Sequence, residues 1–323
     1  MKKPDPVEQA LDRLGSLRSG AESSATSTPE LKAFLKNKSN LVVAKAAKIA
    51  GELHATDLID DLVSAFHRFM VNPQKLDKSC AATTEIAATL YQMDYVEPEI
   101  YLLGIHHVQM EGSFGPPVDA AAKLRAYSAL GLARTRHPQI LEEIVRLLVD
   151  PWPQARIGGV RALASNGGHA GALLLRLKVL TGEDELDVLS ECFSGLLAYA
   201  PDSSLPLVAT YIDSEDHAVA EAALLAIGSS RIPGALALLQ ERWERSTLSP
   251  LRSALLLAIA MVRSEAAIEF LISLLPDSNL QTAKDIITAL AIFRDNSKVR
   301  LEVEQAVSAR NDNTLREAFR RTF

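Results

Sequence analysis

The stretch ARIGGVRALA, residues 155–164, is the clearest copy of a pattern that recurs along this 323-residue chain. Each copy places small residues at neighbouring helical positions and ends in Ala-Leu-Gly or a near match. Good copies also span residues 122–131, 219–228 and 251–260, and weaker ones end at Gly51, Ala88, Leu197 and Ala291. From Gly131 onward the copies end roughly every 31 to 33 residues, a period typical of a short two-helix repeat. The first two steps are longer, at roughly 37 and 43 residues, which indicates insertions early in the chain.

A companion helix is predicted between successive copies. Residues 139–149, 206–212 and 266–275 carry apolar side chains at i, i+3, i+4 and i+7, the stripe of a helix that is buried on one face. No stretch alternates polar and apolar residues over a sustained length, so we expect no β-sheet. The chain is therefore predicted to be an all-α solenoid of about eight stacked helical hairpins, over residues 29–323.

Composition and charge exclude several classes of protein. Hydrophobic residues make up 48% of the chain and charged residues 23%, which is enough apolar material for a packed core. The formal net charge of −6 argues against a nucleic-acid partner, because dedicated nucleic-acid binders carry basic surfaces. The N-terminus shows no secretory signal, and no segment approaches the ~20 apolar residues of a membrane span, so a cytoplasmic protein is expected. Cys80 and Cys192 are too far apart in the repeat register to bridge, and both are predicted to be buried thiols.

The repeat pattern and its turns carry a family resemblance. A second helix that ends in Ala-Leu-Gly, after an Asp-bearing turn and a Val-Arg-like start, resembles HEAT repeats. The closest resemblance is to the short bacterial variety, also called HEAT-like or phycobilisome-lyase-type repeats. It extends from about residue 30 to about residue 310. It implies an armadillo-like stack of hairpins in which turn Asp and helix-start Arg residues form a ladder. The residues that match this ladder are Asp150, Asp213 and Asp277 with Arg156 and Arg252, and the ladder is expected to be broken at Val43, Leu189, Ala220 and Ala283.

Two segments lie outside the repeat register. Residues 1–28 combine an amphipathic helix around Leu11 and Leu14 with a polar linker. This helix is expected either to cap the first repeat or to dock a partner. The second segment is an inserted loop at residues 104–119, where glycines and prolines forbid a continuous helix. Its apolar and aromatic residues are expected either to pack against the solenoid or to contact a partner.

Motifs for catalysis and metal binding are missing from the sequence. The 7 histidines form no HExxH motif, and none of them is followed by glutamate. This argues against the helical-repeat hydroxylases, which hold iron through paired His-Glu motifs. No phosphate-binding glycine loop and no GxSxG nucleophile elbow occurs. We therefore predict no enzyme activity, no metal and no cofactor.

Two alternatives to a pure binding role stay open. DNA alkylation-repair glycosylases cradle duplex DNA in HEAT-like repeats, and Trp152 with Asp150 loosely resembles an aromatic residue beside an acid in such an enzyme. The Asp-Pro-Trp-Pro turn is more simply a junction between repeats. Bilin lyases share the repeat type, so a lyase-like accessory protein is the other alternative, although nothing in the sequence marks a chromophore pocket.

The second helix of each repeat is expected to line an inner curve, with its spacer residues facing a groove. In chain order these residues are Lys45, Lys48, Glu85, Arg125, Ser128, Arg161, Ser190, Glu191, Ser194, Glu221, Ser253, Lys284 and Asp285. The first half of this series is mostly basic and the middle of the second half acidic, so separated charges would direct a bound protein segment.

The sequence therefore predicts a non-catalytic protein–protein interaction scaffold, whose partner and oligomeric state are unknown. Its partner-binding residues are predicted to be Lys45, Lys48, Arg125 and Arg161 in the groove and His106, His107 and Phe114 in the inserted loop. The alternative is a solvated inner face with no ligand.

Overall fold

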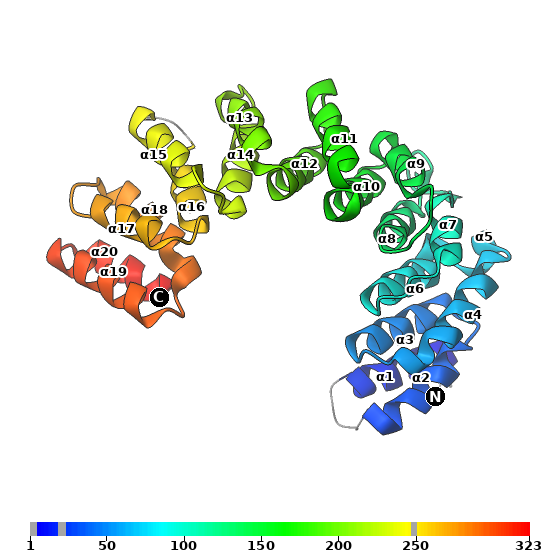
Figure 1. Ribbon diagram of the computed structural model, residues 1–323. Helices are drawn as coiled ribbons and strands as arrows, with labels where there is room; N and C mark the ends of the chain where they lie inside the picture. The colour runs from blue at the N-terminus through cyan, green and yellow to red at the C-terminus, as the bar shows by residue number, and fades with distance from the viewer. Residues whose placement is uncertain (1–4, 19–23, 247–250) are drawn as a thin grey trace. The chain divides into compact units, whose positions relative to one another are not determined.

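The protein is an all-α solenoid, as predicted from the repeat pattern (Figure 1). The computed structural model describes residues 5–18, 24–246 and 251–323. The chain forms two compact units, Met1–Leu175 and Arg176–Phe323. The boundary between them falls inside one helix, α11 (Gly168–Thr181).

The first unit is built from two rows of helices. One row comprises α1 (Pro6–Arg18), α3 (Asn40–Glu52), α6 (Ala81–Gln92), α8 (Ala122–Leu132) and α10 (Pro153–Asn166), each packed on the one before. The companion row comprises α2 (Ser24–Leu35), α4 (Ile59–Met70), α7 (Pro98–Ile105) and α9 (Ile140–Val145). Three 3₁₀ helices, η1 (Thr56–Leu58), η2 (Lys78–Cys80) and η3 (Arg146–Val149), and the one-turn α5 (Pro73–Leu76) complete the connections.

The second unit repeats this arrangement. Its first row comprises α12 (Leu186–Tyr199), α14 (His217–Ser230), α16 (Arg252–Met261), α18 (Leu280–Leu290) and α20 (Asn313–Thr322), again each next to the one before. The companion helices are α13 (Pro201–Thr210), α15 (Ala235–Arg245), α17 (Glu265–Leu274) and α19 (Ser297–Ala309), with η4 (Tyr211–Asp213) and η5 (Ala291–Phe293).

Small residues of the repeat pattern allow helices within a row to approach closely. A Cβ atom added at Gly158 of α10 would lie 2.3 Å from Cα of Ala126 in α8. One added at Gly228 of α14 would lie 2.2 Å from the carbonyl oxygen of Ala258 in α16. Ala162 is fully buried in the same way. The pattern therefore specifies helix contact at backbone distance, which larger side chains would prevent.

Two enlarged connections of the first unit lie against each other. Residues 71–80 join α4 to α6 and residues 106–121 join α7 to α8, in agreement with the early insertions expected from the longer repeat spacing. The second connection contains an antiparallel pair of strands, β1 (Met110–Glu111) and β2 (Val118–Asp119). The expectation of no β-sheet was therefore wrong here. Strands of two residues are too short to show polar and apolar alternation in a sequence.

The N-terminal helix packs as the cap of the first unit. Leu14 and Leu17 of α1 are buried, and α1 lies against α3. The ammonium group of Lys45 donates a hydrogen bond of 2.6 Å to the carbonyl oxygen of Leu11, which ties the two helices together. Helix α2 begins at Ser24, so it includes the last residues of the segment expected to be a polar linker, and residues 19–23 lie outside the described residues.

None of the helices within the described ranges is long and apolar enough to cross a lipid bilayer.

Candidate binding site on an anchored hairpin

The loop between α7 and α8 is fixed to the first unit through the guanidinium group of Arg125. Residues 106–119 of this loop, with strands β1 and β2, are called the hairpin below. Arg125 Nη1 donates hydrogen bonds of 2.6 Å to Asp119 Oδ2 and 2.9 Å to the carbonyl oxygen of His107. Its Nε and Nη2 donate to the two carboxylate oxygens of Asp150, at 2.8 and 3.0 Å. Arg125 is only 3% exposed, so one buried cation joins both ends of the hairpin to the turn before α10.

This arrangement keeps Arg125 and Asp119 charged despite their burial. Burial alone would raise the pKa of Asp119, but backbone N–H donors from Gln109 and Ala121 and the guanidinium of Arg125 lower it below its usual value of 3.8. Burial likewise opposes the charge on Arg125, and the carboxylates of Asp150 and Asp119 outweigh it, so the pKa of Arg125 is raised. The group is therefore a compensated buried ion cluster, with each charge held by hydrogen bonds.

A second buried network joins the hairpin to residues 71–80. The side-chain amide of Gln109 donates to the carbonyl oxygen of Asp77 at 2.9 Å and to Glu111 Oε1 at 2.6 Å. Glu111 also accepts a 2.7 Å bond from the backbone N–H of Ser79. The carboxylate of Asp77 accepts from the backbone N–H groups of Ala82 and Thr83 at the start of α6. Both insertions are consequently parts of one hydrogen-bonded structure.

The buried thiols lie in surroundings that favour the neutral form. Burial is the main cause that raises the pKa of Cys80 to about 12, and the negative charges of Asp77, Glu111 and Asp119 add to it. Burial also raises the pKa of Cys192 to about 12. The prediction that both cysteines are buried free thiols is confirmed, and neither has the low pKa of a reactive thiolate.

The tip of the hairpin differs from its base in being fully exposed and partly apolar. Phe114 is 116% exposed, and Met110, Val108 and Val118 are each about half exposed. Ser113 stabilises the turn, because its hydroxyl donates to the carbonyl oxygen of Pro116 at 2.7 Å. Packing against the solenoid, one of the two expectations for this loop, holds for its base, while the tip is exposed and contact with a partner stays a prediction.

The two loop histidines lie between base and tip. His107 Nε2 lies 3.2 Å from Gln109 Oε1, and His106 Nε2 lies 2.9 Å from Glu143 Oε2 on α9. His107 is half-buried and His106 exposed. The contact of His106 joins the hairpin to α9, whereas that of His107 lies within the hairpin. Within the described ranges, no group of three or more His, Cys, Asp or Glu side chains is placed to hold a metal ion.

The predicted groove position of Arg125 was wrong. Its side chain is buried in the ion cluster, and the neighbouring Ser128 is fully buried as well. The reason is the insertion before α8, which supplies Asp119 and the carbonyl oxygen of His107 as partners that ordinary repeats lack. Arg125 is therefore an anchoring residue and cannot contact a partner directly.

The other predicted groove residues lie at different degrees of exposure. Lys48 of α3 and Arg161 of α10 are exposed, while Lys45 is half-buried and bonded to α1. Burial raises the pKa of Glu85 on α6, although nearby Lys48 opposes this shift.

The turn before α10 holds the carboxylate of Asp150 in several hydrogen bonds. Both carboxylate oxygens of Asp150 bind Arg125, and Oδ1 also accepts from the backbone N–H of Trp152 at 2.9 Å. Arg156 reaches the same turn and donates to the carbonyl oxygen of Asp150 at 2.8 Å. Asp150 thus stabilises the junction between repeats. It binds Arg156, as the expected ladder predicts, and also Arg125.

Sequence reasoning missed the buried polar residues Asp77, Gln109 and Asp119. Two signals were available, since Asp77 lies four residues before α6 and Asp119 three residues before α8, and acids commonly cap helices. Gln109 carried no signal, because its partners come from a separate insertion. Local spacing can suggest a cap, but it cannot show that two loops meet.

Comparisons with known proteins leave the family open. No protein-family model and no curated protein matches the chain. Human deoxyhypusine hydroxylase, solved in complex with glycerol, is similar at 16% identity and a TM-score of 0.31, over 80% of this chain and 92% of that one. An engineered protein is similar at 14% identity and a TM-score of 0.37, over 99% of this chain and 95% of that one. Similarities this low carry no conclusion about activity.

Proposed function

We propose that this protein is a non-catalytic binding scaffold, and that the hairpin tip is a contact site for a protein or peptide partner. The observation that supports it is the contrast within one loop: a base held by buried ion pairs and an exposed tip that carries Phe114. An aromatic side chain on a fixed support binds with a small loss of conformational entropy. Aromatic residues are also enriched among those that dominate binding energy at protein interfaces.

The surroundings of the tip fit a protein partner better than a small molecule. Its residues Val108, Met110, Phe114 and Val118 are exposed to solvent. Small-molecule sites are concave and largely enclosed, whereas a projecting apolar tip suits insertion into a partner's surface. The ion cluster of Arg125, Asp119 and Asp150 supports the tip and does not bind the partner itself, since each of its charged groups is already paired within the cluster.

Substitution of the tip tests this proposal. We expect Phe114→Ala combined with Met110→Ala to leave the far-ultraviolet circular dichroism and melting temperature unchanged, because neither side chain is buried. Binding to partners captured from the native host should fall about tenfold or more, which corresponds to about 1.4 kcal/mol or more for a dominant aromatic contact. Quantitative mass spectrometry of affinity-purified material, followed by titration with the purified partner, measures the loss.

The matched control removes exposed apolar area elsewhere. Leu180→Ala with Leu301→Ala alters two side chains of the second unit that are 62% and 55% exposed, and it should bind partners as the unchanged protein does. Equal partner binding by the tip variant and the control variant, with both folded, would overturn the proposed site.

A further inference from the structure

The repeat places four polar positions in one line across the second unit. Glu221 of α14, Ser253 of α16, Asp285 of α18 and Glu317 of α20 have residue numbers that successively differ by 32, the repeat length. These four helices pack on one another in this order. Equivalent positions on successive repeats occupy equivalent places, so the four residues follow a single track along the row of helices.

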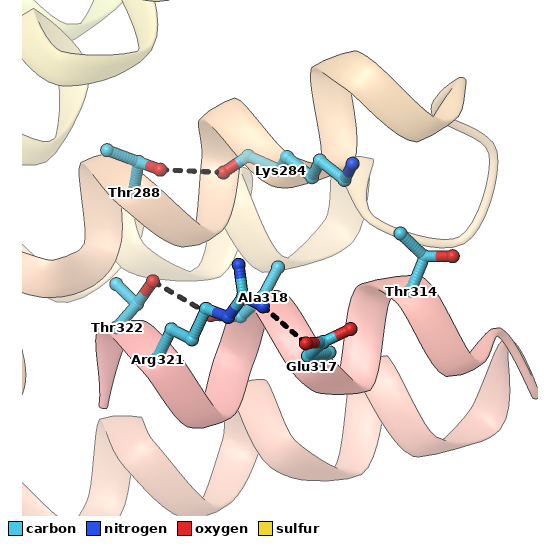
Figure 2. Close-up of a pocket in the computed structure, with 7 residues that line it drawn as sticks. All are labelled: Lys284, Thr288, Thr314, Glu317, Ala318, Arg321 and Thr322. Carbon is cyan, nitrogen blue, oxygen red and sulfur yellow. Dashed lines mark hydrogen bonds and ion pairs between the residues drawn. The ribbon is translucent and has the colours of Figure 1, made fainter.

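Two hollows open along this track and meet at Thr288. The first hollow has a volume of about 190 Å³ and is lined by Glu221, Ser253, Ala254, Leu257, Asp285, Thr288 and Ala289. The second has a volume of about 300 Å³ and is lined by Lys284, Thr288, Thr314, Glu317, Ala318, Arg321 and Thr322 (Figure 2). Because Thr288 lines both, the hollows are neighbours along α14, α16, α18 and α20, and together they are called the terminal groove below.

The two ends of the terminal groove carry opposite charge. The first hollow is lined by the acidic residues Glu221 and Asp285 and by apolar residues that include Leu257. The second has the cations Lys284 and Arg321, and Arg321 extends from α20 and pairs with Glu317 in Figure 2. Its net charge is therefore positive. Opposite charges at a fixed separation select both the charge and the direction of a bound segment.

Two of these charged groups are open to solvent, since Glu221 is exposed and Lys284 half-buried. Among the residues that the structure describes, neither the Glu221 carboxylate nor the Lys284 ammonium has a hydrogen-bond or ion-pair partner. The hydroxyl groups of Thr288 and Thr322 instead donate to carbonyl oxygens of their own helices, Lys284 and Ala318. A carboxylate beside apolar lining residues suits a lysine or arginine side chain, which has an apolar stem and a cationic head, and the ammonium of Lys284 suits an acidic group.

We infer that the terminal groove binds an extended peptide segment of a partner protein, with a basic side chain in the Glu221–Asp285 hollow and an acidic group in the Lys284–Arg321 hollow. This inference rests on the proposed scaffold function and names the chemistry of a second contact. The hollows cover three helix spacings of about 8–10 Å each. An extended segment advances about 3.3 Å per residue, so about seven to nine residues span the groove.

A displayed library of random nine-residue peptides, selected on the full-length protein, tests this inference. The expected enriched peptides contain an arginine or lysine and an aspartate or glutamate at a constant separation and in a constant order. Synthetic versions should bind Glu221→Gln/Asp285→Asn about tenfold more weakly than the unchanged protein, because the basic side chain loses its carboxylate partners. Lys284→Gln should weaken the same peptides by acting on their acidic residue.

A charge-matched control separates the groove from general electrostatics. Glu215→Gln/Glu304→Gln removes two exposed carboxylates of the second unit that lie outside the groove, and it should leave peptide affinity unchanged. The inference fails if selected peptides lack the charge pair, or if they bind the groove and control variants equally. If only Phe114→Ala abolishes peptide binding, the groove inference is overturned while the scaffold proposal is supported. If no peptide is selected at all, the result counts against both.

Discussion

At the residue scale, Arg125 shows how one side chain can determine what a loop presents. Its guanidinium group holds Asp119 and the carbonyl oxygen of His107 on the hairpin side and Asp150 on the repeat side. The repeat pattern alone predicted a groove position for Arg125, since spacer residues of ordinary repeats face solvent. The true environment of Arg125 depends on an insertion, and the local spacing of residues does not reveal how that insertion folds.

Replacement of Asp119 by Asn should expose the electrostatic part of this anchoring. At pH 7 we expect the free energy of unfolding of the variant to be lower than that of the unchanged protein by about 1.5–3 kcal/mol, the range for hydrogen bonds to a charged group. The folded-state pKa of Asp119 is lowered, so its contribution is complete above the unfolded-state value and is lost as pH falls through the folded-state pKa.

Urea unfolding at a series of pH values between 7 and about 3 provides the measurement. The stability difference between the unchanged protein and Asp119→Asn should stay constant down to about pH 4 and shrink below it. A difference that is absent at pH 7, or that does not change in acid, would contradict the ion cluster.

At the element scale, the sequence predicted the repeat helices well because their contacts recur. Gly158 and Ala162 in α10, and Gly228 and Ala226 in α14, are buried or closely packed at positions that the pattern marks. The hairpin was predictable only as an interruption. Its two-residue strands and the Gln109 link to Asp77 arise from contacts between separate insertions, which period and propensity do not encode.

Matched glycine substitutions test the close approach of α8 and α10. Gly158→Ala should lower the free energy of unfolding by about 1–3 kcal/mol, because its new Cβ would lie 2.3 Å from the backbone of Ala126. Gly15→Ala in α1 is the control, since its Cβ would lie 3.5 Å from the flexible end of Lys45. There the helix should gain about 0.5–1 kcal/mol. Equal effects of the two substitutions in chemical unfolding would show that α8 and α10 do not meet at backbone distance.

At the scale of the whole molecule, architecture could be predicted from the sequence and function could not. The recurring small-residue pattern, with a period of roughly 31 to 33 residues from Gly131 onward, determines the solenoid, because each hairpin buries its apolar face on its neighbours. The finer resemblance to bacterial HEAT-like repeats stays a prediction. The proposed contacts rest on Phe114, which lies on an insertion, and on the charges of Glu221 and Lys284, and these residues point to a kind of partner without naming it.

The most direct measurement of the scaffold claim is photo-crosslinking from the hairpin tip in living cells of the native host. A photoreactive phenylalanine analogue at position 114 should form a covalent adduct with a defined partner, because that side chain is fully exposed on a fixed support. The same analogue at Leu301 should give no such adduct. An adduct specific to position 114, which disappears when Met110→Ala is added, is the result expected. Irradiation that yields no adduct above the Leu301 control would contradict the claim that the tip binds a partner.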